Sequence, residues 1–113
     1  MHIVRDKVAL DELKEMSKKM HYNLVKVVVD VERHIMAVDA GMHADAETLL
    51  LEDGSLQENL WGINIYPYEP IDTWIEFYST INMRPSYGNR TRGVDDMRTQ
   101  QMIKKIVNSM VIR

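Results

Sequence analysis

The stretch that decides the fold runs from Leu24 to Ala40 and reads LVKVVVDVERHIMAVDA. Valine recurs at every second position in its first half, which is the period of a β-strand with one buried face. These residues are Val25, Val27, Val29 and Val31. The polar pair Glu32-Arg33 then predicts a turn, and the segment from His34 to Ala40 reads as a second strand. The stretch therefore predicts an antiparallel β-hairpin.

A register that opposes Asp30 with Ile35 gathers the apolar side chains of this hairpin on one face. The pairs are Val29 with Met36, Val27 with Val38, and Val25 with Ala40. On the other face Lys26 comes opposite Asp39, a favourable pair of opposite charges. Because a slip of one residue would expose the valines, the apolar pattern favours this register.

The segments around the hairpin predict further strands and helices. The predicted elements are an edge strand over His2–Val4, a helix over Leu10–Met20, a helix from the N-cap Asp45 to Leu51, a strand over Leu60–Tyr66, a strand over Trp74–Met83, and a helix from the N-cap Asp96 to about Ile112. The residues from Arg84 to Gly93 are predicted to form a loop. In the last helix Ile103, Ile106, Val107 and Met110 form the apolar stripe.

These elements follow one another in the order β-α-β-β-α-β-β-α. Hairpin connections predict a largely antiparallel sheet of roughly four to five strands, with two to three helices packed on one face. The fold class is therefore α+β. With 113 residues, no linker and no internal repeat, residues 1–113 are expected to form one domain.

Composition excludes several classes of function. The chain has no cysteine, which rules out disulfides, Cys-ligated zinc, iron–sulfur clusters and a cysteine nucleophile. No apolar run is long enough for a signal peptide or a membrane span, so we expect a cytoplasmic protein without a membrane partner. The net charge of −3 disfavours nucleic acid as a partner. No cofactor is predicted.

Four stretches of the chain resemble a family of small, uncharacterised prokaryotic proteins. They are HAD at 43–45, GSLQENLWGINIYP at 54–67, INMRPSYGNR at 81–90 and VDD at 94–96. The resemblance extends over nearly the whole chain. It implies a stand-alone cytoplasmic protein of unknown function, and it supplies no catalytic residues.

The stretch NMRPSYGNRTRG, from Asn82 to Gly93, is the first candidate site. Three arginines without an acid suit an anion such as phosphate or carboxylate, and glycine and asparagine permit the backbone turns that bind anions. The predicted ligand-binding residues are Arg84, Tyr87, Asn89, Arg90 and Arg92, together with His43 and Asn64. The alternative is structural. The arginines would then bind helix carbonyls and acids, either the neighbouring Asp95 and Asp96 or Asp39, Asp45 and Glu47 folded onto the loop.

A second candidate site combines Asp39, His43 and Asp45, whose side chains are metal-ligand types. Their spacing matches no known metal motif, and Asp45 is already assigned as an N-cap. No metal site is therefore predicted here.

The third candidate is the outward face of the later strands. Its residues are Asn64, Tyr66, Glu76, Tyr78, Asn82 and Arg84. Most of the aromatic residues lie in the same part of the chain, namely Trp61, Tyr66, Tyr68, Trp74, Phe77, Tyr78 and Tyr87. Aromatic side chains mixed with polar groups favour an interface, and a twofold homodimer is the default geometry. The alternative is a further core layer beneath loops.

Three functions stay open on the sequence alone. The first is a small binding or interaction protein that works as a homo-oligomer. The second is an enzyme or sensor for an anionic small molecule at the loop from Arg84 to Arg92. The third is nucleic-acid binding through the same loop. No elbow motif or telling serine–histidine spacing identifies a catalytic residue, so catalytic residues stay unknown.

Overall fold

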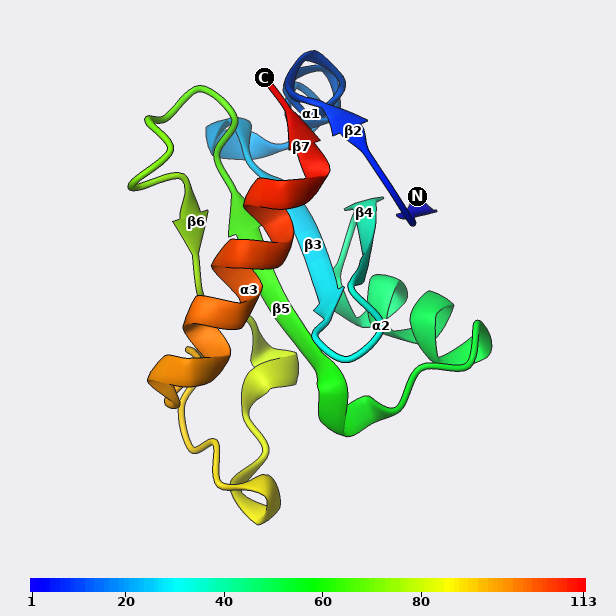
Figure 1. Cartoon of the computed structure of the whole chain (residues 1–113), viewed down its shortest axis with the longest axis vertical. Helices are drawn as coiled ribbons and strands as arrows, with labels where there is room; N and C mark the ends of the chain where they lie inside the picture. Colours follow the sequence, from blue (N-terminus) through cyan, green and yellow to red (C-terminus); the bar gives the residue numbers. More distant parts are fainter.

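The predicted hairpin forms the centre of a five-stranded antiparallel sheet in the computed structural model, which describes all 113 residues (Figure 1). The strands lie in the order β1-β4-β3-β5-β6. Their bounds are β1 His2–Val4, β3 Val25–Asp30, β4 Ile35–Ala40, β5 Leu60–Ile65 and β6 Ile75–Glu76. A separate parallel pair, β2 Val8–Ala9 with β7 Val111–Ile112, ties the two ends of the chain together. The predicted α+β class and antiparallel sheet are confirmed.

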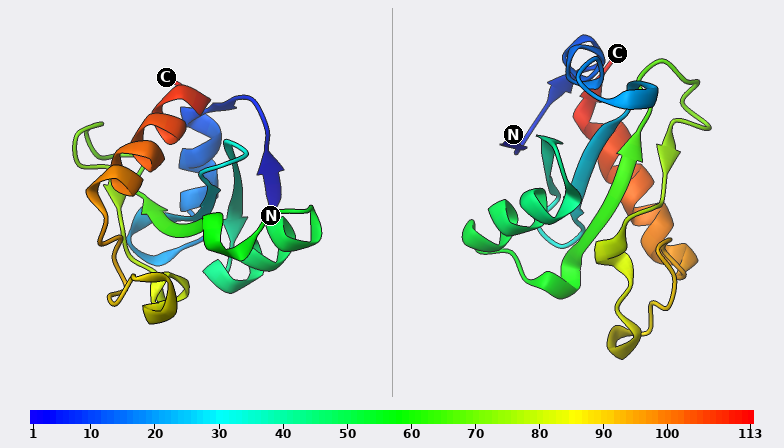
Figure 2. Two further views of the ribbon diagram at one scale, coloured as in Figure 1. Left: turned by 60° about the horizontal axis from the view of Figure 1, so that its bottom comes forward. Right: turned by 180° about the vertical axis from the view of Figure 1, so that it is seen from behind.

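Helices cover both faces of the sheet, which corrects the prediction of a single covered face (Figure 2). On one face, α1 (Leu10–Ser17) and α3 (Met97–Met110) bury the alternating valines of β3. On the other, α2 (His43–Glu52) packs on a smaller core through Ala46 and Leu50. The second face is apolar because Val28, Ile35 and Ala37 alternate with the first set. Both faces of the hairpin therefore need a cover.

The hairpin register is right at the turn and wrong at the open end. Asp30 pairs with Ile35 and Val29 with Met36, but the register shifts between Val28 and Lys26. Asp39 has a φ of 62°, so it forms a bulge that inserts one extra residue into β4. The predicted pair of Lys26 with Asp39 is therefore wrong, and Lys26 lies opposite Ala40.

Two helix boundaries also differ from prediction. The second helix begins at His43 with Met42 as its N-cap, so Asp45 sits inside the first turn and is not the cap. The first helix ends at Ser17, about one turn early. The N-cap of α3 is Asp96 as predicted, and its carboxylate accepts a hydrogen bond from the Thr99 amide at 3.2 Å. The four predicted stripe residues of α3 are its buried ones.

The strand predicted over Trp74–Met83 is wrong beyond Glu76. The Ser79 hydroxyl accepts a hydrogen bond from the Ile81 amide and starts a short 3-10 helix over Thr80–Asn82. In place of a paired strand, the Asn82 side chain binds the backbone of Gly62 on β5, accepting from its N–H at 2.8 Å and donating to its carbonyl at 2.9 Å. One amide side chain thus replaces a backbone peptide at the sheet edge.

None of the three α-helices is both long and apolar enough to cross a membrane.

Candidate functional site

The arginine loop, Arg84 to Gly93, contains side chains with different roles. Arg84 is anchored: its Nη2 donates to the Leu60 carbonyl at 2.8 Å and its Nη1 donates to the Gln57 carbonyl. Its guanidinium also lies 4.5 Å from the centre of the Trp61 ring. Burial lowers the pKa of Arg84, an effect that the charge of Glu47 opposes. Arg84 therefore has the structural role given above as the alternative, because it binds backbone carbonyls near a helix end.

Asn89 holds the inside of the arginine loop together. Its side chain is buried and its Nδ2 lies within hydrogen-bonding distance of the carbonyls of Asn82, Thr91 and Gly93. Its Oδ1 accepts from the Asp95 amide at 2.8 Å. Because every polar atom of this amide is used inside the loop, Asn89 has no group left for a ligand.

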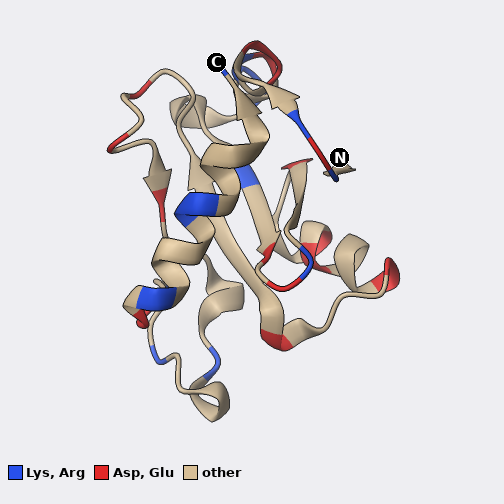
Figure 3. Cartoon of the chain, viewed as in Figure 1, with Lys and Arg blue, Asp and Glu red and all other residues tan.

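Tyr87, Arg90 and Arg92 are exposed on the arginine loop, which projects at one end of the molecule (Figures 1 and 3). The Asp95 carboxylate accepts from the Arg90 backbone amide and the Thr91 hydroxyl rather than from a guanidinium. These hydrogen bonds lower the pKa of Asp95, and the bond from the Thr91 hydroxyl has the largest effect. The guanidinium groups of Arg90 and Arg92 form no ion pair, with Asp39, Asp45 and Glu47 or with any other acid.

His43 and Asn64 lie away from the arginine loop side chains, in a second polar cluster on the α2 side of the sheet. Lys26 on β3, Asn64 on β5 and Glu76 on β6 are cross-strand neighbours in one row. Directly opposed residues point to the same face of a sheet, so the three side chains stand side by side. His43 begins α2 next to this row. The structure therefore separates the predicted ligand-binding residues into two groups.

A cavity of about 380 Å³ opens beside this row, and we name it the Lys26 cavity. Its lining residues come from three places on the chain: Lys26 from β3, Met42, His43 and Ala44 from the start of α2, and Ser79, Thr80 and Ile81 from the 3-10 helix region. The failure of β6 to continue past Glu76 is what lets the last three reach the α2 side.

The imidazole of His43 has a defined tautomer. Its Nε2 lies 2.8 Å from the Ile63 carbonyl oxygen, and a carbonyl only accepts, so Nε2 carries the proton. Burial lowers the pKa of His43, the bond to Ile63 opposes this, and the Lys26 charge lowers it further. At neutral pH the ring is therefore uncharged, and Nδ1 offers an acceptor lone pair.

Asn64 and its neighbours form a hydrogen-bonded network next to the cavity. Asn64 Nδ2 donates to the Glu76 carboxylate at 2.8 Å, and the Tyr66 hydroxyl donates to the same oxygen at 3.1 Å. Burial, followed by the bond to Glu76, raises the pKa of Tyr66. The Asn64 Oδ1 is buried without any hydrogen-bond partner, so this amide retains one free acceptor.

The aromatic face predicted as an interface does not form. Trp74 is fully buried in the main core, and its indole N–H donates to Asn108. Trp61 lies under Arg84, whereas Tyr68 and Tyr87 belong to separate loops. Of the aromatic residues in this part of the chain, Tyr66 and Tyr78 are those that the outward face contains. Assembly into a homodimer stays a prediction, without the shared aromatic face that motivated it.

The three residues considered as metal ligands lie in three different environments. Asp39 pairs with Lys19 at 2.9 Å, His43 lines the Lys26 cavity, and Asp45 is exposed on α2. No group of three histidine or acidic side chains comes together anywhere in the structure.

Lys26 is the residue of this cluster that the sequence pattern missed, because the predicted register paired it with Asp39. The signal was present: a lysine interrupts a valine strand that is buried on both faces. A cation at such a position either finds a partner or lines an opening.

Acidification is expected to destabilise the protein through His43. Its pKa is lower in the folded chain than the ordinary value of 6.5, so the unfolded chain binds more protons in this range. The stability that the neutral ring provides is present above pH 6.5 and is lost as the pH falls through the folded pKa. Urea unfolding between about pH 7.5 and 5.5 should show the free energy of unfolding decreasing.

The control for this prediction is His43→Gln, whose amide can still donate to Ile63 but does not titrate. This variant should lose most of the pH slope, whereas His21→Gln at an exposed position should keep it. An unchanged slope in His43→Gln would mean that other groups set the pH response.

Comparison with protein families gives one match. The family model described as a protein of unknown function (DUF5674) matches residues 2–110, nearly the whole chain. No curated protein and no solved structure matches the chain.

Proposed function

The chain belongs to the DUF5674 family, whose function is unknown, and for this chain we propose a binding role: the Lys26 cavity holds the anionic group of a small molecule. The observation that carries the proposal is Lys26 itself. It is a half-buried cation that lines a cavity, and it forms no ion pair and no hydrogen bond.

The other lysines with buried stems or nearby acids are all partnered. Lys14 and Lys104 place their ammonium groups over the rings of Tyr68 and Phe77. Lys18 pairs with Glu15, and Lys19 pairs with Asp39. Lys26 has no such partner, so its ammonium is available to an anion in the cavity.

The surroundings of Lys26 define what the anion carries. Ser79 and Thr80 bring hydroxyl groups to the cavity, and the first amides of α2 have no partner inside the helix. These donors suit carboxylate or phosphate oxygens. The neutral His43 offers an acceptor at Nδ1, so the ligand also has room for a hydroxyl or amino donor. A small hydroxy acid, amino acid or phosphate ester fits this set of groups.

The expected result is a rise in melting temperature with carboxylates or phosphate at fixed ionic strength, relative to chloride. Only a species bound to the folded chain stabilises by mass action, and saturation to 100 times Kd contributes about 2.7 kcal/mol. For a domain of this size that corresponds to a shift of roughly ten degrees or more. Lys26→Met keeps the aliphatic stem and removes the charge, so it should abolish the shift.

Lys104→Met is the matched control, because Lys104 is also half-buried but lies over Phe77 and outside the Lys26 cavity. It should leave the anion response intact. If Lys26→Met responds to anions like the unmodified chain, Lys26 is not the anion-binding residue.

A second candidate is anion binding by the arginine loop, including the phosphates of a nucleic acid. It is favoured by the exposed, unpaired guanidinium groups of Arg90 and Arg92 on a loop that Arg84 and Asn89 hold in shape. In the same melting series, loss of the anion response in Arg90→Ala with Arg92→Ala, but not in Lys26→Met, would assign the site to this loop. A flat response to every anion would contradict both candidates.

A further inference from the structure

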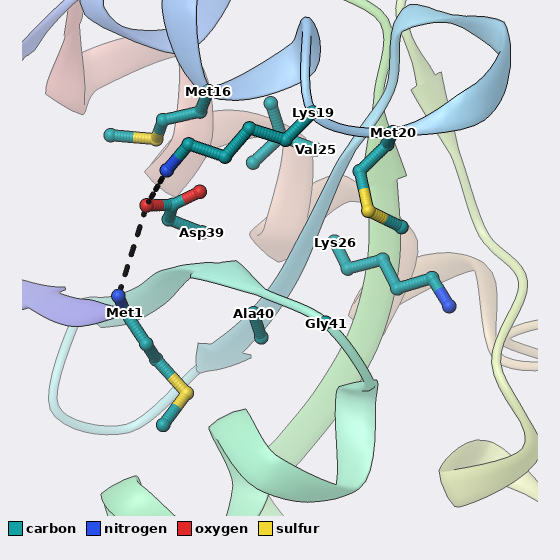
Figure 4. Close-up of a pocket in the computed structure, with 9 residues that line it drawn as sticks. All are labelled: Met1, Met16, Lys19, Met20, Val25, Lys26, Asp39, Ala40 and Gly41. Carbon is teal, nitrogen blue, oxygen red and sulfur yellow. Dashed lines mark hydrogen bonds and ion pairs between the residues drawn. The ribbon is translucent and has the colours of Figure 1, made fainter.

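Lys26 lines two cavities. One is the polar Lys26 cavity, and the other lies between the end of α1 and the open end of the β3–β4 hairpin, with a volume of about 250 Å³ (Figure 4). We name the second the methionine cavity, because Met1, Met16 and Met20 line it together with Val25. The Lys26 ammonium points away from Asp39 and out of the methionine cavity (Figure 4), and Lys26 is the residue that the linings of the two cavities share.

The charges at the methionine cavity are already paired. Lys19 Nζ lies 2.9 Å from Asp39 Oδ2, and the Met1 nitrogen lies 3.8 Å from the same oxygen (Figure 4). The bulge at Asp39, with its φ of 62°, is what brings this carboxylate to the cavity rim instead of opposite Lys26. The methionine cavity therefore contributes apolar walls, and its two cations share the Asp39 carboxylate, whereas Lys26 has no acidic partner.

The lining of the methionine cavity is adaptable. Methionine is unbranched and polarizable, and it can repack around an apolar group of varied shape. Three of the nine methionines of the chain meet at this one cavity. Its volume equals that of about eight liquid water molecules at ~30 Å³ each. This is room for a short aliphatic chain and too little for a large ring system.

On the basis of the function proposed above, we infer that the ligand is an amphiphile: its anionic head lies at Lys26 and its aliphatic chain lies in the methionine cavity. The stem of Lys26 suits this arrangement, since lysine covers apolar groups with its methylenes and keeps its ammonium at the polar end. The ligand class is thus short- to medium-chain aliphatic carboxylates or alkyl phosphates.

The test is a chain-length series measured by calorimetry, with butanoate, hexanoate and octanoate as the probes. A methylene transferred from water to an apolar cavity contributes enough to lower Kd about three- to fourfold. We expect Kd to fall by that factor for each added methylene until the cavity is full, and then to level off. Octyl phosphate should bind like octanoate. Octyltrimethylammonium, with the same chain and the opposite charge, should not bind.

Two matched variants test where the aliphatic chain of the ligand lies. Met20→Gln keeps the length of the half-buried Met20 side chain but makes it polar, so it should remove the dependence on chain length and leave the binding of inorganic phosphate unchanged. Met97→Gln makes the same change at an exposed position on α3 and should have no effect. With ¹³C-methyl methionine labels, octanoate should shift the Met16 and Met20 signals and not those of Met97 and Met102.

The outcomes separate this inference from the proposed function. If butanoate binds through Lys26 but longer chains bind no more tightly, the inference fails and the anion site stands. If the chain-length effect survives in Met20→Gln, the aliphatic chain lies elsewhere and the inference also fails. The same conclusion follows if octanoate leaves the Met16 and Met20 signals of the unmodified protein unshifted. Equal binding of octyltrimethylammonium would show apolar adsorption and overturn it as well. If no carboxylate or phosphate binds at all, both fall.

Discussion

Replacing Asn82 with aspartate is expected to lower the free energy of unfolding by about 3 kcal/mol or more. The Asn82 amide is fully buried, and its Nδ2 donates to the carbonyls of Gly62 at 2.9 Å and Arg92 at 3.0 Å. Asn82→Asp removes both donors and places a carboxylate against two carbonyl oxygens. Urea denaturation of the variant at neutral pH measures the loss.

The pH dependence of Asn82→Asp gives a second signature. Burial beside carbonyl oxygens raises the pKa of the introduced carboxyl, so its protonated form, which can donate one hydrogen bond, is the compatible one. The variant should regain stability relative to the unmodified chain as the pH is lowered. Asn23→Asp, an exposed position whose side chain forms no hydrogen bond, is the control and should change stability by no more than about 0.5 kcal/mol. A loss in Asn82→Asp no larger than in this control would mean that the side-chain bridge to Gly62 is not formed.

Replacing Gly62 with alanine is expected to cost about 2–3 kcal/mol. A Cβ at Gly62 would lie 2.5 Å from the Ser79 Cβ, 2.7 Å from its hydroxyl oxygen and 3.1 Å from an Ile81 side-chain carbon. The first of these distances is far inside van der Waals contact, and the Ser79 backbone is held by a hydrogen bond to the Arg92 carbonyl. Thermal or urea unfolding of Gly62→Ala measures this effect, and Gly41→Ala, with nothing within 4 Å, should be nearly neutral.

Ser79→Gly should rescue much of the loss in Gly62→Ala, because it removes the two atoms that lie closest to the new methyl group. Alone, Ser79→Gly loses the hydroxyl that caps the following 3-10 helix and should cost only about a few tenths of a kcal/mol. In the double variant the two effects should be strongly non-additive, recovering most of the loss. Ser79→Ala should rescue little, since its Cβ remains. Additive effects would contradict the predicted contact.

The contacts behind these two predictions give a structural role to the polar side chains between Asn82 and Arg92. Asn82, Arg84 and Asn89 use their polar atoms to hold the arginine loop against β5, in place of a continuing strand. Their specificity is therefore structural. Some of the predicted ligand-binding residues still have groups available, namely the exposed Tyr87, Arg90 and Arg92, the cavity-lining His43, and Asn64 through its Oδ1.

The central hairpin, the α+β class and the apolar stripe of α3 could all be predicted from sequence patterns. Each of these depends on side chains spaced at the period of a single element: two residues for β3 and β4, and three to four for Ile103, Ile106, Val107 and Met110. Such periodicity is local and survives in any tertiary arrangement. The N-cap at Asp96 is local for the same reason, because its partner Thr99 is three residues away.

Only the tertiary structure decided what surrounds Lys26. The bulge places Asp39 beside Lys19, twenty positions earlier in the chain, and beyond β6 the Asn82 side chain binds Gly62 twenty positions away. Neither contact has a period that a sequence pattern could reveal. Yet the first frees Lys26 from its predicted partner, and the second turns Ser79 and Thr80 toward it. The cavity that we propose as the site therefore joins segments that no local sequence pattern brings together.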